Sequence, residues 1–312
     1  MYIINHRGFF FWLTGVILAG AIGAVVFFGL PLSIDFTGGS LIEVSYTGVR
    51  PDIVALKEEM SVLSIGEVSI RESSESGIVL RSKTLNPEEH QAVIAILSDK
   101  GAAPLTELRF NSIGPSLGSE LGKKALWAIL AVTFAIMLYI AWAFRRVSKP
   151  VPSWGYGITV VAMLAIDIIV PTGFYAILCH FTGAEVDVLF IVALLALLGY
   201  CVNDVIIVFD RVREHLKLNE EGNIQQSFED VVGTAITETL GRSINTSLTV
   251  VLALLALIFL GAEATRNFAL VLLVGVVIGT FSSICRSAPL LIPLAHWFAK
   301  DTDAASTKKS KR

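Results

Sequence analysis

The sequence predicts a polytopic α-helical membrane protein with six transmembrane helices and one exported α+β domain between the first and second helices. Two observations support this fold class: an apolar composition, and six long apolar stretches interrupted by one segment of different character. Of the 312 residues, 54% are hydrophobic and 16% are charged, whereas soluble domains have about 45–50% and about 25%. A chain of this composition is not expected to fold as a single soluble globule.

Each of the six apolar stretches is long enough to cross a bilayer as a helix, which takes about 20 residues. They occupy residues 9–30, 125–144, 156–178, 188–209, 244–260 and 268–298. The first contains small residues typical of a signal cleavage site at 19–21, but its apolar run continues further, so we interpret it as a retained anchor. The last is longer than a span requires, and Pro289 and Pro293 are expected to bend or end it.

Basic residues gather beside alternate ends of these spans, a pattern that marks cytoplasmic loops. They are Arg7, Arg145, Arg146, Lys149, Arg211, Arg213, Lys217, Arg242, Lys300, Lys308, Lys309, Lys311 and Arg312. The short loops on the other side hold Glu185, Asp187 and Glu263, with Arg266 as their basic residue. We therefore expect residues 1–30 to be a cytoplasmic N-terminus with the first helix, 31–124 an extracytoplasmic domain, 125–298 the other five helices, and 299–312 a basic cytoplasmic tail.

The segment 31–124 has the alternating and amphipathic patterns of a small soluble domain. Strands are predicted at residues 40–47, 65–71, 77–83 and 105–113, and helices at 51–62 and 86–97. Asn86 is suited to cap the second helix, because Pro87 and Glu89 follow it. The resulting order of strand, helix, strand, strand, helix, strand is the ferredoxin-like pattern, which is compatible with many functions.

Several classes of function have no support in the composition. The 24 basic and 27 acidic residues leave a net charge of −3, so no bulk basicity predicts a nucleic-acid partner. Cys179, Cys201 and Cys285 are widely spaced, and the five histidines lack the spacing of metal ligands. We therefore predict no disulfide framework and no metal site. We also expect no cofactor and no enzymatic activity.

Ionisable residues within spanning helices carry the functional prediction, because each costs about 2.5–3.5 kcal/mol or more to place in lipid. Asp167 lies in the middle of the third helix, and Asn203 and Asp204 lie in the inner half of the fourth. Asp204 lies six positions before Asp210, which places Asp204 about 9 Å deeper in the membrane. A carboxylate at that depth must find a partner, meet water or take up a proton.

Arg242, at the entrance of the fifth helix, is the partner of Asp204 that depth alone favours. It is followed by the polar residues Ser243, Asn245, Thr246, Ser247 and Thr249. These residues predict a polar seam between the fourth and fifth helices. Two interpretations stay open: a permanent buried ion pair that only joins two helices, and a titrating site coupled to transport.

Three further features of the predicted transmembrane helices bear on function. Asp167 is either a second coupling carboxylate or a protonated group that bonds neighbouring helices. Arg286 is expected to reach the inner interface and is assigned no role. Gly275 and Gly279 form a GxxxG pattern, which favours a close helix contact either within the chain or with another subunit.

Two motifs relate the chain to a known family. The segment directly after the first helix reads DFTGG, and its residues are Asp35, Phe36, Thr37, Gly38 and Gly39. The run GYCVNDVIIVFDRVRE occupies residues 199–214, and further similarity covers 242–247 and 275–284. On these residues the chain resembles the SecD and SecF export proteins of the RND-type transporter superfamily, and the SecF members in particular. Independently of that resemblance, the DFTGG glycines suit a tight turn into the first strand.

The resemblance implies a partnership with SecD, which is built to the same plan, in a twelve-helix core of the bacterial inner membrane. It implies further association with the SecY, SecE and SecG channel, with YidC and YajC as additional partners and a translocating preprotein as the cargo. It also implies use of the proton motive force, with sodium ions as the alternative coupling ion, to promote late steps of preprotein translocation.

The coupling residues of the family carry over one at a time. They are Asp204, Asn203, Arg242 and Asp167. The chain departs from the family at Cys201, where serine is usual, at Val205, where threonine is usual, and at Ile166, where histidine commonly stands. The working hypothesis is that protonation of Asp204 weakens its pairing with Arg242, shifts the fourth and fifth helices and tilts the outward domain.

Three rival functions predict different behaviour. An RND-like half-transporter for lipid or small molecules would work without SecD. An intramembrane aspartyl protease would use Asp167 and Asp204, but the expected GxGD motif is missing. A structural scaffold for the translocase would tolerate loss of charge at Asp204 and Arg242.

Overall fold

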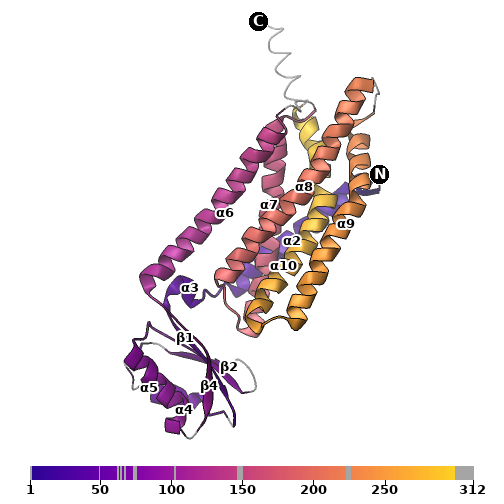
Figure 1. Cartoon of the computed structure of the whole chain (residues 1–312). Helices are drawn as coiled ribbons and strands as arrows, with labels where there is room; N and C mark the ends of the chain where they lie inside the picture. Colours follow the sequence, from indigo (N-terminus) through magenta and orange to yellow (C-terminus); the bar gives the residue numbers. More distant parts are fainter. Residues whose placement is uncertain are drawn as a thin grey trace. The chain divides into compact units, whose positions relative to one another are not determined.

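The chain forms two compact units, which Figure 1 shows in a computed structural model. The structure describes residues 2–48, 50–61, 63, 65–66, 68–72, 76–101, 103–145, 150–222 and 226–298. The small unit comprises Pro31–Trp127 and Glu185–Asp187, and the helical unit comprises Met1–Leu30, Ala128–Ala184 and Val188–Arg312. The predicted basic residues Arg146 and Lys149 and the tail 299–312 lie outside the described residues.

The small unit is built on a four-stranded antiparallel sheet. Its strands are β1 (Gly39–Tyr46), β2 (Ser69–Glu72), β3 (Gly77–Ser82) and β4 (Leu105–Ile113), in the order β2-β3-β1-β4. Helix α4 (Ile53–Ser61) follows β1, and helix α5 (Pro87–Leu97) precedes β4. The predicted succession of strands and helices is therefore confirmed.

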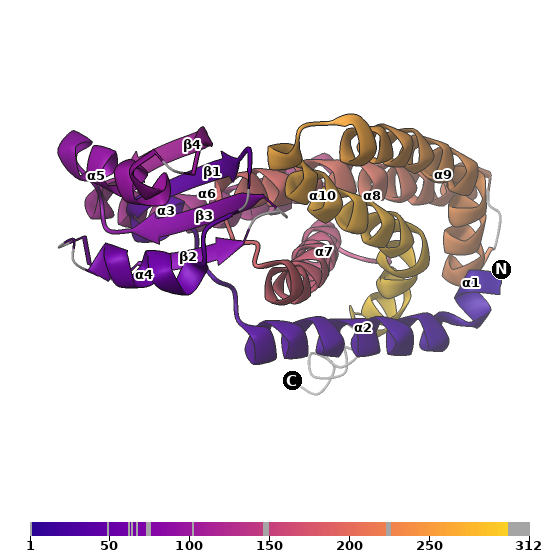
Figure 2. The same ribbon diagram turned by 90° about the horizontal axis from the view of Figure 1, so that it is seen from below.

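Helices α4 and α5 cover one face of the sheet (Figure 2). Alternate residues of β1 and β3 point into this core, as expected for strands with one buried face. The core residues are Ile42, Val44, Tyr46, Ile78 and Leu80 from the strands, with Leu56, Met60, Val93 and Leu97 from the helices. The predicted cap of α5 is confirmed, because Asn86 accepts from the Glu89 N–H at 2.8 Å and Glu89 accepts from the Asn86 N–H at 2.9 Å.

Strand β2 begins four residues later than predicted. Ile65 and Val68 are buried in the core, but they belong to a loop in which Gly66 has φ of +75°. A positive φ interrupts an extended strand. The apolar pattern that predicted a strand from residue 65 therefore reflects burial of loop side chains.

The described residues contain six helices that are long and apolar enough to cross a membrane, as predicted, and they are consistent with a multi-pass membrane protein. They are α2 (Arg7–Phe28), α6 (Pro115–Ala143), α7 (Ser153–Thr182), α8 (Val188–Gly222), α9 (Phe228–Leu260) and the last helix, Glu263–Phe298. Helices α8 and α9 extend well past their apolar stretches. Arg211 of α8 and Glu238 of α9 form an ion pair there, so the polar extensions are held to each other.

The last helix changes its helical geometry in its C-terminal half. It consists of α10 (Glu263–Ser282), a π-helical turn η2 (Ser283–Ser287) and a further helical stretch to Phe298. The prolines do not end the helix, contrary to one of the two expected outcomes. Pro289 has no N–H and crowds the carbonyl four residues earlier, and a widened turn before it relieves both problems. The distortion therefore falls at 283–287, before the proline itself.

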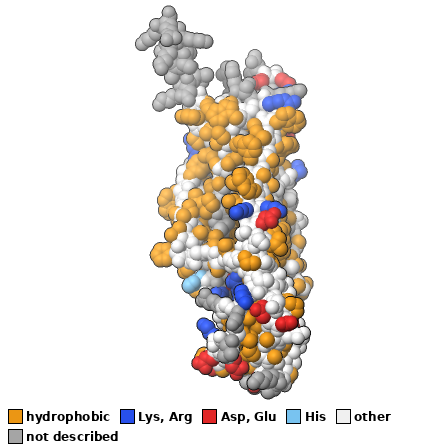
Figure 3. Space-filling model, turned by 90° about the vertical axis from the view of Figure 1, so that its left-hand side faces the viewer, with side chains coloured by type: hydrophobic (Ala, Val, Ile, Leu, Met, Phe, Trp, Pro, Cys, Tyr) orange, Lys and Arg blue, Asp and Glu red, His pale blue; other side chains and the backbone are white. Residues whose placement is uncertain are grey.

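Within the helical unit, α10 packs against α7, α8 and α9, and α2 packs against α7. Hydrophobic side chains cover much of the outer surface of this unit (Figure 3). Among them are Phe134 and Trp142 of α6, which are 57% and 61% exposed. Such a surface suits contact with lipid tails or with other apolar helices.

Candidate functional site

Asp204 lies on α8 inside the helical unit, and only 4% of it is exposed. Its Oδ1 accepts a hydrogen bond from Ser243 Oγ of α9 at 2.7 Å. Its Oδ2 accepts from Ser283 Oγ of the π turn at 2.5 Å. Both carboxylate oxygens are therefore bound by hydroxyl groups, and the side chain joins three helices.

A second set of hydroxyl groups lies further along the same helices. Tyr200 Oη of α8 donates to Ser247 Oγ of α9 at 2.9 Å. Ser247 Oγ is also 2.6 Å from Thr280 Oγ1 of α10. The predicted polar seam between the fourth and fifth helices is therefore present at Ser243 and Ser247, and it includes the sixth helix as well. The prediction is wrong for Asn245, Thr246 and Thr249, which are exposed. We call the side chains of Tyr200, Asp204, Ser243, Ser247, Thr280 and Ser283 the polar cluster.

Asp167 on α7 forms an ion pair with Arg286 of the π turn, with Arg286 Nη2 and Asp167 Oδ1 3.3 Å apart. The two side chains are 1% and 3% exposed. The expectation that Arg286 reaches the interface is therefore wrong, because its side chain is buried and pairs with Asp167. A hydropathy pattern gives the depth of a residue but not the direction it faces, and the π turn alters that direction for the residues after 282.

The predicted pairing of Asp204 with Arg242 is also wrong in this structure. Arg242 is exposed, whereas its neighbour Ser243 is fully buried and bonds Asp204. Successive residues on a helix point about 100° apart, so only one of the two can face α8 at that level. Equal depth in the membrane is therefore not enough to make Arg242 the partner of Asp204. Asn203 is exposed for the same reason, next to a buried Asp204.

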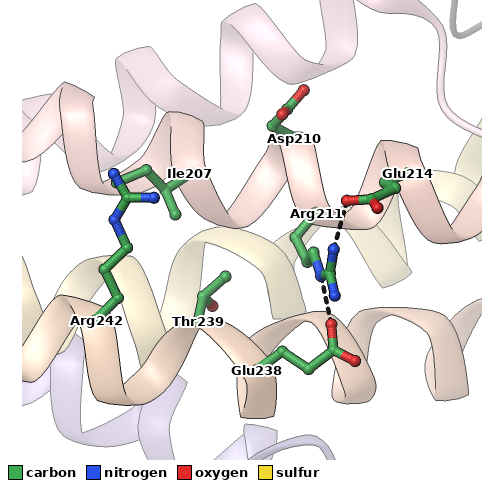
Figure 4. Close-up of a pocket in the computed structure, with 7 residues that line it drawn as sticks. All are labelled: Ile207, Asp210, Arg211, Glu214, Glu238, Thr239 and Arg242. Atoms are coloured by element: carbon green, nitrogen blue, oxygen red, sulfur yellow. Dashed lines mark hydrogen bonds and ion pairs between the residues drawn. The ribbon is translucent and has the colours of Figure 1, made fainter.

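Arg242 instead lines a cavity of about 330 Å³ between α8 and α9 (Figure 4). The other lining residues are Ile207, Asp210, Arg211, Glu214, Glu238 and Thr239. Arg211 forms ion pairs with both Glu214 and Glu238, and the Arg242 side chain extends away from them. Among the described residues, the ion pairs of this cavity do not include Arg242.

The GxxxG glycines make their close contact within the chain. A Cβ on Gly275 would lie 2.4 Å from Leu197 Cδ2, and one on Gly279 would lie 2.3 Å from Cys201 Sγ. Both partners belong to α8. The glycines therefore allow α10 to approach α8 closely, and this approach brings Ser283 within hydrogen-bonding distance of Asp204.

The DFTGG segment forms a capped turn in the small unit. It begins as the short helix α3 (Ile34–Thr37), where Ser33 Oγ accepts from the Asp35 N–H at 3.1 Å. Thr37 Oγ1 donates to the Ser33 carbonyl at 3.0 Å. The hydroxyl groups of Ser33 and Thr37 therefore serve the local backbone.

The two glycines of this motif occupy positions that other residues adopt only with strain. Gly38 and Gly39 have φ of +74° and +124°. A Cβ on Gly38 would lie 2.6 Å from Pro115 Cα, and one on Gly39 would lie 2.6 Å from the Ser82 carbonyl oxygen. The predicted tight turn into the first strand thus has both a conformational and a steric requirement for glycine.

Comparisons with known proteins place this architecture in a defined class. Residues 93–297 match the family described as protein export membrane protein SecD/SecF, C-terminal. Residues 23–48, which contain the glycine turn, match the SecD/SecF GG motif. The six-helix unit with its small α+β unit is therefore that of a SecD/SecF-type membrane protein.

Similar proteins with assigned names show which member of the SecD/SecF family this chain resembles. The chain is 33% identical to the protein translocase subunit SecF of Anaerolinea thermophila, over 97% of this chain and 99% of the relative. It is 36% identical to that of Thermobaculum terrenum, over 96% and 94%. The chain belongs to the SecF family and is a SecF-like subunit of the Sec protein export machinery.

Two solved structures have the same fold. A crystal structure of SecDF from a Thermus species, described as a translocon-associated membrane protein, matches with a TM-score of 0.79 and 29% identity. A crystal structure of SecDF in a super-membrane-facing form matches with a TM-score of 0.65 and 28% identity. The matches cover 94% and 98% of this chain but 38% and 40% of the SecDF chains, so it spans about two fifths of their length.

Proposed function

We propose that this chain pairs with SecD and uses the proton motive force to promote late steps of preprotein translocation. The SecF relatives support the export role, and the partial coverage of SecDF chains supports SecD as the missing half. In the same role the chain would contact the SecY, SecE and SecG channel and also YidC and YajC. The cargo is a preprotein emerging from that channel.

The position of Asp204 is the observation that carries the coupling part of the proposal. It is a carboxyl group buried between three helices, and both of its oxygens contact hydroxyl groups. A hydroxyl group can donate or accept a hydrogen bond, so it can partner a carboxylate and, after reorientation, a carboxylic acid. Asp204 can therefore change its charge while keeping polar partners.

Loss of the negative charge would alter the contacts that hold α8, α9 and α10 together. A conformational change follows only if two states of the protein bind the proton with different affinity. One charge crossing about 100 mV supplies about 2.3 kcal/mol, so we expect many small cycles in place of one strong pull. Protons are the proposed coupling ion, and sodium ions are the alternative.

The proposed coupling site also includes Asn203, Arg242 and Asp167, although none of them contacts Asp204 in the way that the sequence suggested. Asn203 and Arg242 lie on exposed faces of α8 and α9, where they are available to a partner subunit or to water. Asp167 is part of a buried ion pair. Since Asp204 bonds Ser243 and Arg242 is exposed, the coupling step does not consist of breaking a pair between Asp204 and Arg242.

The proposed location is the bacterial inner membrane, with the residues before α2 and after the last helix in the cytoplasm. The distribution of lysine and arginine supports this orientation. The segment 31–124 would then be extracytoplasmic. Its strand order and antiparallel pairing support a ferredoxin-like domain there, in the position expected to meet the emerging preprotein.

The test is export into inverted membrane vesicles that contain Asp204→Asn at the normal level. We expect ATP-driven insertion to persist and the gradient-dependent part of export to be lost. The matched control is Asp210→Asn, because Asp210 lies on the same helix but is exposed and paired with Arg213. Full gradient dependence in Asp204→Asn would reject the coupling role and favour a structural scaffold, for which the bridging of three helices by Asp204 would suffice.

A further inference from the structure

The π turn Ser283–Ser287 carries one contact to each of the two buried carboxylates. Its first residue, Ser283, donates to Asp204 on α8. Its fourth residue, Arg286, pairs with Asp167 on α7. The two acidic side chains therefore depend on the same five residues of backbone.

Isolated π turns within α-helices are uncommon and occur often at functional sites. Conversion of such a turn to α geometry changes the direction of the side chains that it carries. A movement that takes Ser283 away from Asp204 would therefore also move Arg286 relative to Asp167. Gly279 lies one turn earlier and packs against Cys201 of α8, so the start of the π turn is held close to that helix.

The ion pair is not saturated with hydrogen bonds. It has one contact, of 3.3 Å, whereas a strong arginine–carboxylate pair has two parallel bonds of about 2.7–2.9 Å. Within the described part of the chain, Asp167 Oδ2 and Arg286 Nε are buried without a hydrogen-bond partner. A permanent structural pair would be expected to use these atoms, and the spare capacity suits a pair that rearranges.

We infer that Arg286 is a positioning residue of the coupling site. Through the π turn, Arg286 connects its ion pair with Asp167 to Ser283, the serine that binds Asp204. The inference rests on the proposed coupling role of Asp204. In this arrangement a change of charge at Asp204 reorients and alters its hydrogen bond with Ser283. The π turn then shifts, and the Asp167–Arg286 pair changes its geometry. Movement at α8 is thereby passed to α7.

The test removes both charges of the pair in the full-length chain, in membranes that contain its partners. Loss of both partners of a buried ion pair is tolerated far better than loss of one. We therefore expect Asp167→Asn with Arg286→Gln to reach the wild-type level and to keep ATP-driven insertion. Its gradient-dependent export should fall at least tenfold. Arg286→Lys, which retains the charge, should keep at least half of that export.

The matched control removes another ion pair of the same unit. Arg7 of α2 and Glu229 of α9 are paired at 2.7 Å and are partly exposed. Arg7→Gln with Glu229→Gln should leave gradient-dependent export unchanged. If this control loses as much as the buried pair does, the effect is not specific to Asp167 and Arg286 and the inference fails.

A spectroscopic measurement separates positioning from simple structural support. The infrared band of the Asp204 carboxyl is identified by its disappearance in Asp204→Asn. It should shift in the variant lacking both charges and stay near the wild-type position in Arg286→Lys. An unchanged band together with full gradient dependence would show that the pair only joins two helices.

If the variant without the charges does not accumulate, Pro289→Ala decides the question. It leaves every charge in place but removes the reason for the π turn. We expect it to shift the Asp204 band and to lower gradient-dependent export, and an unshifted band would overturn the inference. Failure of the proposed function is distinguished by Asp204→Asn, because retention of gradient dependence in that variant rejects the coupling role whatever the ion pair does.

Discussion

The two carboxylates buried in the helical unit are held by different chemical groups. Asp204 has one hydroxyl donor for each oxygen. Asp167 has a guanidinium group at one oxygen, and its other oxygen has no hydrogen-bond partner among the described residues. Both are within a few per cent of full burial, so the difference lies in their partners and not in their access to water.

The partners determine what each carboxylate can do with a proton. A serine hydroxyl accepts a hydrogen bond as well as donating one, whereas a guanidinium group only donates. A proton on Asp204 would keep its hydrogen bonds after reorientation of a hydroxyl. A proton on Asp167 would leave Arg286 as an uncompensated buried charge, which is strongly unfavourable. Asp204 thus has partners that suit either charge state, whereas the partner of Asp167 suits the carboxylate.

Arg286→Met is expected to give the largest effect, because it leaves Asp167 buried without its counter-ion. Breaking a buried pair in this way costs about 3–5 kcal/mol of stability. The free energy of unfolding in detergent, or the steady-state level in the membrane, measures it. Addition of Asp167→Leu should restore most of the loss, and a double variant as unstable as the single one would argue against a pair.

Ser243→Ala is expected to give the next largest effect, because it removes one of the two donors to Asp204. A buried acceptor left without its donor costs about 1–3 kcal/mol, and a charged one costs more. Thr246→Val is the control, since Thr246 lies three residues further along the same helix on an exposed face and should change stability by less than about 0.5 kcal/mol. Equal thermal stability of both variants would show that the hydroxyl contributes nothing.

Gly279→Ala should have a smaller effect by separating α8 from α10. The added Cβ would lie 2.3 Å from Cys201 Sγ, and such overpacking costs about 1–3 kcal/mol. Alanine recovers about 0.5–1 kcal/mol of that over glycine in a helix. At Gly199 a Cβ would meet nothing within 4 Å, so Gly199→Ala should be neutral or stabilising. A thermal melt of the two variants in parallel tests the contact, and identical melts would contradict it.

The architecture was accessible from the sequence because it depends on one-dimensional patterns. Apolar length predicted six spans, and alternation with capping residues predicted the succession of strands and helices in the small unit. The seam residues Ser243 and Ser247 were predicted for the same reason, because polar residues in a spanning helix tend to face other helices.

The partners of the carboxylates were not accessible from the same patterns. Arg242 and Ser243 are adjacent in sequence, and only the rotation of α9 determines which of them meets Asp204. Arg286 faces inward after a π turn, which no apolar period predicts. In the sequence, the inward direction of Arg286 is indicated only by Pro289. A proline clashes with the preceding turn and so signals a local change of helical geometry.

The carboxylate of Glu185, unlike those of Asp167 and Asp204, is partly accessible to water. Glu185 of the small unit pairs with Arg81, and its carboxyl lies 3.9 Å from Arg71. Burial raises the pKa of Glu185 above its ordinary value of 4.5, although Arg81 and Arg71 act to lower it. Glu89 behaves oppositely, because the Asn86 backbone N–H lowers the pKa of Glu89.

These shifts predict opposite dependences of stability on pH. With a raised pKa at Glu185, the folded unit binds more protons than the unfolded chain does just above pH 4.5, so its free energy of unfolding falls as the pH rises through that window. The stabilisation at Glu89 is instead lost as the pH falls through its lowered pKa. Glu185→Gln should therefore abolish the decline above pH 4.5, and Glu72→Gln, at an exposed pair with Arg50, should not. Hydrogen exchange of the β1 and β3 amides in the full chain, corrected for intrinsic rates, measures this, and an unchanged decline in Glu185→Gln would show that Glu185 does not set it.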